Sequence, residues 1–177
     1  MSILKVARMG HPVLRAKTPA LERAAIKTPA IQKLIDDMIE TMREYHGVGL
    51  AAPQVHEGVR LFVAALESGD PDAEAAEAEP IALINPEITV VGTTILEDWE
   101  GCLSIPDVRG RVARAREIKV RAYDRAGARV DISAHDFPAR VIQHESDHLD
   151  GVLFVDRMKS FESLTFLEEY SRYWIKD

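Results

Sequence analysis

The chain has 177 residues, of which 46% are hydrophobic and 29% charged, and its formal net charge is −7 at pH 7. This length and composition suit one globular domain, so we expect residues 1–177 to form a single unit. No apolar run approaches the roughly 20 residues of a membrane span, and an acidic chain lacks the basic face that sequence-specific nucleic-acid binding needs. The N-terminus has neither signal-peptide nor transit-peptide features. These observations favour a cytosolic protein and leave a processed organellar form open.

The first clear element is an amphipathic helix near residue 30. Thr28 suits an N-cap and Pro29 the first helical position. The apolar residues that follow recur every three or four positions, which gives one apolar stripe. We expect this helix to run to about His46, with Gly47 just beyond its end.

The middle of the chain predicts strands separated by loops. Residues 60–66 (RLFVAAL) have the pattern of a buried strand. Residues 68–80 are acidic and alanine-rich, which predicts an exposed loop insertion. Residues 81–84 and 88–96 predict two further strands, the second of which contains Gly92 as a turn residue.

The following part predicts a hairpin and a second helix. Residues 117–123 and 129–133 alternate polar and apolar side chains, and the turn signal of residues 124–127 lies between them. The apolar segment from Phe137 onward predicts a helix, because Pro138 suits a first turn.

Two elements are expected near the C-terminus. The apolar residues 152–155 predict a short strand, and residues 161–173 predict a helix within the C-terminal segment 161–177. Together the elements predict an α+β fold with mostly antiparallel sheets packed around one central helix, flanked by N- and C-terminal helices.

The central helix carries the pattern H-E-x-x-H at His144, Glu145 and His148. Residues four apart share one face of a helix, so both imidazoles can bind one metal ion. The glutamate can then reach a water molecule on that metal, as in zinc hydrolases. A helix surface that carries two histidines and two acids is the alternative interpretation. The chain lacks the glycine and third histidine of the longer zinc-protease motif, so a third ligand must come from elsewhere.

Cys102 is the only cysteine of the chain and follows Glu100 and Gly101. Glycine allows the backbone of such a loop to approach a ligand closely. One thiolate and two imidazoles would leave a fourth position open, which is typical of catalytic metal sites. A buried free thiol without function is the alternative.

A third segment, Gly-Val-Gly-Leu-Ala-Ala-Pro-Gln at residues 47–54, follows the first helix. Its small residues would let the backbone of a ligand lie close to the chain, and Gln54 adds a neutral amide donor. The segment lacks the third glycine and the following helix of a dinucleotide-binding turn.

These segments together resemble a known family. Residues 47–54, 100–104 and 143–148 resemble the three signature motifs of peptide deformylases, in the family's order and with its approximate spacing. The similarity extends to residues 83–86 and 151–154, and it covers about residues 30 to 158.

The resemblance implies a metal-dependent hydrolase that removes the N-formyl group from the initiator N-formylmethionine of nascent polypeptides and releases formate. It implies that Cys102, His144 and His148 hold one metal ion per chain. Fe²⁺ is the family's preferred ion, and Zn²⁺ or Ni²⁺ can replace it in isolated protein. Glu145 is implied to act as base and then as acid.

Further roles follow only from the resemblance. The Gln54 amide and the backbone N–H of Leu103 would stabilise the oxyanion. A charged pair of Glu100 and Arg114 would hold the cysteine loop, and the backbone of Gly49 would contact the extended substrate.

The methionine pocket would be lined by Val48, Phe137, Val141 and His144, with Arg109 near its mouth. Arg140 stands where the family often has an apolar residue, so its side chain is expected to turn outward or to narrow the site. Asp147 is expected to orient a neighbour rather than bind metal. The implied substrate-binding residues are Gly47, Val48, Gly49, Glu100, Arg109, Phe137 and Val141.

The resemblance also implies partners. N-formylmethionyl nascent peptides are the expected substrates, and ribosome association is expected to be weak or absent because the C-terminal segment lacks the basic helix used by some bacterial members. Two rival functions stay open. One is a zinc peptidase or general amidase, and the other is a silent paralogue that serves as a binding module. The second should lack a ligand, the base or Gln54, and all are present.

Overall fold

The computed structural model describes residues 2–66 and 79–175. The acidic loop expected at 68–80 therefore lies outside the described residues, except for residues 79 and 80. No helix in the described part is long and apolar enough to cross a membrane.

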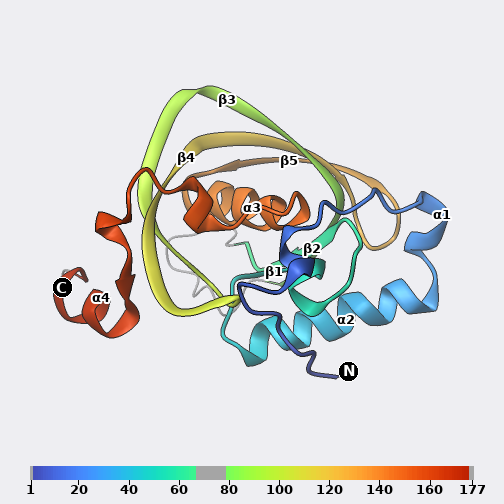
Figure 1. Cartoon of the computed structure of the whole chain (residues 1–177). Helices are drawn as coiled ribbons and strands as arrows, with labels where there is room; N and C mark the ends of the chain where they lie inside the picture. Colours follow the sequence, from blue (N-terminus) through green and yellow to red (C-terminus); the bar gives the residue numbers. More distant parts are fainter. Residues whose placement is uncertain (1, 67–78, 176–177) are drawn as a thin grey trace.

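Helices and one antiparallel sheet form the α+β fold that the sequence predicts. The helices are α1 (Arg23–Ile26), α2 (Pro29–Glu44), α3 (Asp136–Leu149) and α4 (Leu167–Tyr173). The strands are β1 (Gly49–Ala51), β2 (Leu61–Ala64), β3 (Ile81–Cys102), β4 (Ile105–Tyr123), β5 (Arg129–His135) and β6 (Thr165–Phe166). The sheet order is β1-β2-β3-β4-β5, and β6 pairs with β4. In Figure 1 the long strands β3 and β4 curve around α3, and α2 lies below β1 and β2.

The strands predicted at 81–84 and 88–96 are parts of one long strand, β3. Its register against β4 shifts between Ile84 and Glu87 and again between Val91 and Ile95. Gly92 has φ +69° and lies within the second irregularity. A left-handed glycine is typical of a β-bulge as well as of a turn, so the predicted break is a bend within a continuous strand.

The β4–β5 hairpin is confirmed, with its turn at residues 124–127. Two C-terminal predictions were wrong. Residues 152–155 do not form a strand; Phe154–Arg157 is a 3-10 helix whose Asp156 accepts from the Leu153 N–H at 2.7 Å. The helix predicted at 161–173 begins only at Leu167, because the residues before it form a 3-10 turn and strand β6.

The core fixes α3 against the sheet. One face of α3 packs with Phe62 and Ile118 in a cluster of fully buried side chains, and α2 packs on β1 and β2 in a second cluster. Each large apolar side chain that is buried in this way contributes roughly 1.5–3 kcal/mol to the free energy of unfolding. Both ends of α3 are therefore held by the core, and the H-E-x-x-H motif is placed on a rigid element.

Candidate metal centre

Three predicted ligands converge where β3 ends beside α3. The Cys102 Sγ and one ring nitrogen each of His144 and His148 lie within 4.8 Å of one another. The Cys102 Sγ is 3.2 Å from the His148 Nε2. A helix places both imidazoles on one face, and β3 carries the thiol to them from a distant part of the sequence.

Glu100 orients the first histidine. Its Oε2 is 2.8 Å from the His144 Nδ1, which leaves Nε2 free to face the thiol. Arg114 donates to both Glu100 oxygens at 2.9 and 3.0 Å, so the ion pair expected in the cysteine loop is present. A carboxylate that fixes the outer nitrogen of a histidine is a common partner of metal-binding imidazoles.

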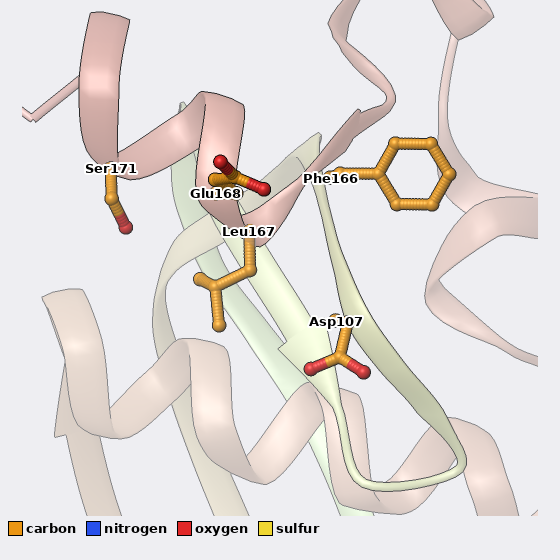
Figure 2. Close-up of a pocket in the computed structure, with 5 residues that line it drawn as sticks. All are labelled: Asp107, Phe166, Leu167, Glu168 and Ser171. Carbon is orange, nitrogen blue, oxygen red and sulfur yellow. The ribbon is translucent and has the colours of Figure 1, made fainter.

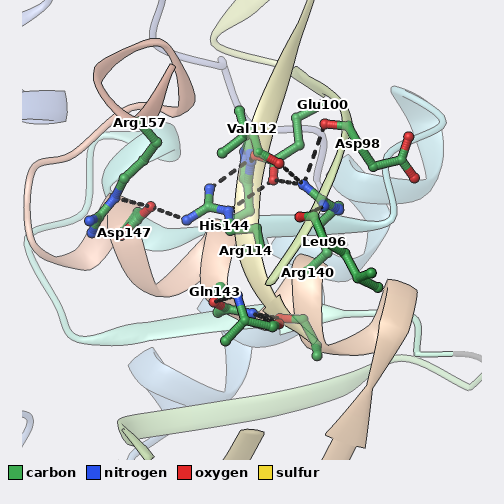
Figure 3. A network of polar contacts seen from close by, with 12 residues as sticks. Leu96, Asp98, Glu100, Val112, Arg114, Arg140, Gln143, His144, Asp147 and Arg157 are labelled. Atoms are coloured by element: carbon green, nitrogen blue, oxygen red, sulfur yellow. Dashed lines mark hydrogen bonds and ion pairs between the residues drawn. The ribbon is translucent and has the colours of Figure 1, made fainter. Parts of the chain in front are cut away.

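Arg140 also binds Glu100, which the sequence did not predict. Its Nη1 donates to the Glu100 Oε1 and the Val112 carbonyl at 2.8 Å each, and its Nη2 donates to the Leu96 carbonyl at 2.8 Å (Figure 3). The side chain is 7% exposed. It therefore does not turn outward, and it joins α3 to β3 and β4 on the inner side of the pocket.

Asp147 binds two arginines. Its carboxylate accepts from the Arg114 Nη1 at 2.5 Å and from the Arg157 Nη2 at 2.6 Å (Figure 3). Asp147 thus orients neighbouring groups, as the sequence analysis expected. A chain of charges runs from Arg157 through Asp147, Arg114 and Glu100 to the His144 ring.

The electrostatics favour the thiolate form of Cys102 and the protonated form of His144 when no metal is bound. Burial raises the pKa of the Cys102 thiol, but the adjacent His148 and His144 rings outweigh it and hold that pKa well below its usual value. Burial lowers the pKa of His144, and hydrogen bonds to Cys102 and Glu100 outweigh this and raise it well above its usual value. An anionic sulfur between two imidazoles suits a divalent cation.

Glu145 lies in the same site and is almost fully buried. Burial raises its pKa to about 7, despite the opposing effect of the two histidines. Its Oε2 has no hydrogen-bond partner among the described residues. A Cβ at Gly49 would come within about 2.4 Å of the Glu145 Oε1, so only glycine fits there without displacing the carboxylate.

Gln54 presents its amide nitrogen to the cysteine. Its Oε1 accepts from the Ala51 N–H at 2.8 Å, which fixes the orientation of the amide. The Nε2 donates to the Ser104 Oγ at 3.2 Å and lies 3.4 Å from the Cys102 Sγ. The donor is thus held beside the predicted ligands.

A pocket of about 590 Å³ opens beside these groups. All the implied substrate-binding residues line it, and so do Gln54, Leu103, Glu145, Cys102 and His144. His148 is not among the lining residues. Other lining residues were not predicted from the sequence, notably Val6, Arg8, Trp99 and Leu167. Val6 and Arg8 lie near the N-terminus, Leu167 lies near the C-terminus, and Trp99 lies on β3 outside the three motifs. No local sequence pattern predicts that these residues line a pocket.

Comparisons with known proteins show the family of the chain. A family model described as polypeptide deformylase matches residues 3–163. The chain is 45% identical to peptide deformylase 2 of Nostoc sp. over 168 residues, which covers 95% of this chain and 93% of that one. It is 47% identical to a peptide deformylase of Salinibacter ruber over 163 residues, which covers 90% and 82% of the two chains.

Solved structures give the same result. A Met-Ala-Ser-bound class I type b peptide deformylase of Acinetobacter baumannii has a TM-score of 0.81 and 38% identity, and the match covers 89% of this chain and all of that one. The peptide deformylase of Thermotoga maritima has a TM-score of 0.78 and 37% identity, covering 90% and 100%.

Proposed function

The chain belongs to the polypeptide deformylase family and removes the N-formyl group from nascent polypeptides, and from this premise we propose how its own residues perform the reaction. Enzymes of this family depend on a metal. We propose that Cys102, His144 and His148 hold one divalent ion. The observation that carries the proposal is the convergence of their donor atoms within 4.8 Å, beside the unpartnered carboxylate of Glu145.

The donor set fits the metal. The Nδ1 of His144 is engaged by Glu100, so its Nε2 is the donor that remains, and the low pKa of Cys102 supplies a thiolate. Fe²⁺ is the ion we propose, with Zn²⁺ or Ni²⁺ as replacements in isolated protein. When bound, the ion supplies Lewis acidity toward the formyl oxygen and the attacking water.

Glu145 is the proton carrier in this proposal. Its free oxygen can accept a proton from the attacking water and later donate it to the departing amine. Burial raises the pKa of Glu145 above its usual value, and this suits a group that must both lose and gain a proton within one turnover.

Two donors stabilise the oxyanion that forms at the formyl carbon. We assign them as the Gln54 Nε2 and the backbone N–H of Leu103, both of which line the pocket. Anchoring of the Gln54 Oε1 by Ala51 fixes the donor before substrate arrives, which is the condition for effective oxyanion stabilisation.

The peptide backbone is proposed to pair with β1. This strand lies at one edge of the sheet, and Val48 and Gly49 both line the pocket. An extended peptide can add to such an edge. The methionine side chain would then occupy the surface formed by Phe137, Val141 and His144.

We further propose that the enzyme acts in the bacterial cytoplasm and associates only weakly with the ribosome. In α4 the Arg172 guanidinium pairs with Glu168 at 3.0 Å and with Glu169 at 3.4 Å. The positive charge of Arg172 is therefore neutralised by two carboxylates, and α4 is not the basic helix that binding to ribosomal RNA would need.

The test is metal analysis of anaerobically purified protein together with turnover of formyl-Met-Ala-Ser. We expect about one metal ion per chain. We also expect no release of acetate from the acetyl-Met analogue, which a general amidase would cleave. Glu145→Gln should keep the metal and lose turnover, whereas Glu117→Gln on the exposed face of β4 should change neither. A Glu145→Gln enzyme as active as the wild type would refute the assignment.

A further inference from the structure

The C-terminal segment, residues 163–174, lies along β4 next to the cysteine loop. β6 pairs with β4 through Val108 with Phe166 and Arg109 with Thr165. These pairs begin only a few residues after Ile105, where β4 leaves the cysteine loop. The pairing therefore carries the start of α4 to the rim of the substrate pocket.

An aromatic cluster holds the rest of the segment. The Trp99 ring of β3 lies 4.9 Å from the Tyr170 ring and 5.4 Å from the Trp174 ring, between ring centroids. The Arg111 N–H donates to the Ser163 Oγ at 3.1 Å. Contacts at both ends of the segment thus fix α4. Aromatic pairs of this geometry stabilise a fold by more than their buried area alone accounts for.

Leu167, the first residue of α4, lines the pocket that also contains Cys102 and Glu145. Figure 2 shows its side chain pointing toward Asp107 at the start of β4, whereas Phe166 points away. Leu167 and Asp107 also border a neighbouring hollow of about 460 Å³. These two residues therefore form a wall between the substrate pocket and the outer surface.

The position of this wall indicates what it contacts, on the premise of the function proposed above. The formyl group must lie at Cys102 and Glu145, and the methionine side chain is assigned to the surface around Phe137. On the side of the pocket formed by β3, β4 and α4, the apolar lining consists of Trp99, Pro106 and Leu167. This surface is left for side chains that follow the methionine.

We propose that the C-terminal segment is part of the peptide-binding site. Leu167 is a specificity-determining residue that contacts an apolar side chain after the formyl-methionine. Trp99 is a positioning residue that holds α4 against the pocket. The enzyme thereby reads the second or third residue of its substrate with a segment that lies outside all three signature motifs.

The test compares kcat/KM for formyl-Met-Ala-Ala, formyl-Met-Leu-Ala and formyl-Met-Ala-Leu. Wild type should prefer leucine at one of the two positions by about tenfold, since apolar discrimination of this size is typical of hydrophobic subsites. Leu167→Ala should reduce the preference to within about twofold, mainly through KM. Leu164→Ala is the matched control, because this leucine is on the same segment and does not line the pocket.

Tryptophan emission gives a readout that does not depend on turnover. The chain has two tryptophans, Trp99 and Trp174, and both belong to the cluster. Binding of the product Met-Ala-Leu to metal-loaded protein should change the tryptophan emission of the wild type and of Leu164→Ala. In Leu167→Ala the emission change should saturate only at a higher peptide concentration. Trp99→Ala should lose the leucine preference, and Trp99→Phe should restore most of it.

Equal preference in Leu167→Ala and Leu164→Ala would overturn the inference, as would a wild type without any preference and without an emission change. These results leave turnover of formyl peptides intact. Absence of turnover by metal-loaded wild type on all three peptides would instead overturn the proposed function, so the two failures are distinguishable.

Discussion

At the scale of single residues, the burial of Glu145 sets the pH dependence. Its pKa is raised to about 7 from an ordinary value of 4.5 when no cation is present. A bound cation favours the carboxylate and lowers this pKa. The base must be deprotonated to act, so kcat/KM should fall as pH falls through an acid limb between 4.5 and 7.

A pH profile of kcat/KM on formyl-Met-Ala-Ser measures that limb. Metal content is determined at each pH, because protonation of the ligands could release the ion and mimic the effect. An acid limb above pH 7 in fully loaded enzyme would contradict the assignment of Glu145 as the base.

Gln54 is expected to matter in the transition state and little in ground-state binding. Gln54→Ala removes the Nε2 donor, and loss of one oxyanion donor typically lowers kcat by about 10²–10³. KM should change little, since the neutral formyl oxygen gains less from the donor than the oxyanion does. Steady-state kinetics checks this, with Gln32→Ala on the remote α2 as control; a kcat within threefold of the wild type would remove Gln54 from the oxyanion site.

At the scale of elements, Arg140 ties α3 to the two long strands. Arg140→Leu leaves the Leu96 and Val112 carbonyls without this donor and removes one of the two arginines on Glu100. Loss of one partner from a buried charged network costs about 3 kcal/mol. Urea unfolding should show this loss, while Arg116→Leu, an exposed pair with Asp136, should change stability by less than about 1 kcal/mol. Equal effects of the two substitutions would show that the buried network adds nothing.

The sequence predicted those elements whose signals are local. The α2 stripe and the β4–β5 hairpin follow from spacing within one segment. The continuity of β3 cannot be predicted in this way. Gly92 has the same left-handed conformation in a bulge as in a turn, and only the pairing of β3 with β4 distinguishes the two. Residues 152–155 show a related limit: their apolar side chains predict burial, and burial is compatible with a 3-10 helix.

The same distinction holds within the site. The proposed ligands, base and oxyanion donors lie in contiguous motifs, so the sequence could single them out before their geometry was known. Arg140 binds Glu100 across 40 positions of sequence, and Leu167 reaches the pocket only because β6 pairs with β4. Such contacts depend on the complete topology, and no spacing rule within a segment contains them.

At the scale of the whole molecule, the proposed metal site joins two parts of the chain that are distant in sequence. Cys102 ends β3, whereas His144 and His148 lie on α3, so an ion bound by all three links the sheet to the central helix. An ion that binds only the folded state stabilises it in proportion to RT ln(1 + [L]/Kd), which is about 4 kcal/mol at a thousandfold excess over Kd.

Removal of the ion should therefore lower the melting temperature. For a domain of this size each kcal/mol shifts Tm by roughly 2–4 °C, so chelation should lower it by roughly 8–16 °C. Scanning calorimetry with and without chelator measures the shift. In Cys102→Ala the ion has lost its thiolate, so chelator should cause little further change; a large shift in this variant would mean that the stabilising ion is held elsewhere. The Cys102 Sγ is 3.2 Å from the His148 Nε2 without any ion, so part of the contact between β3 and α3 persists in the metal-free protein. The difference between the chelator-induced shifts of wild type and Cys102→Ala therefore measures what the ion adds to this contact.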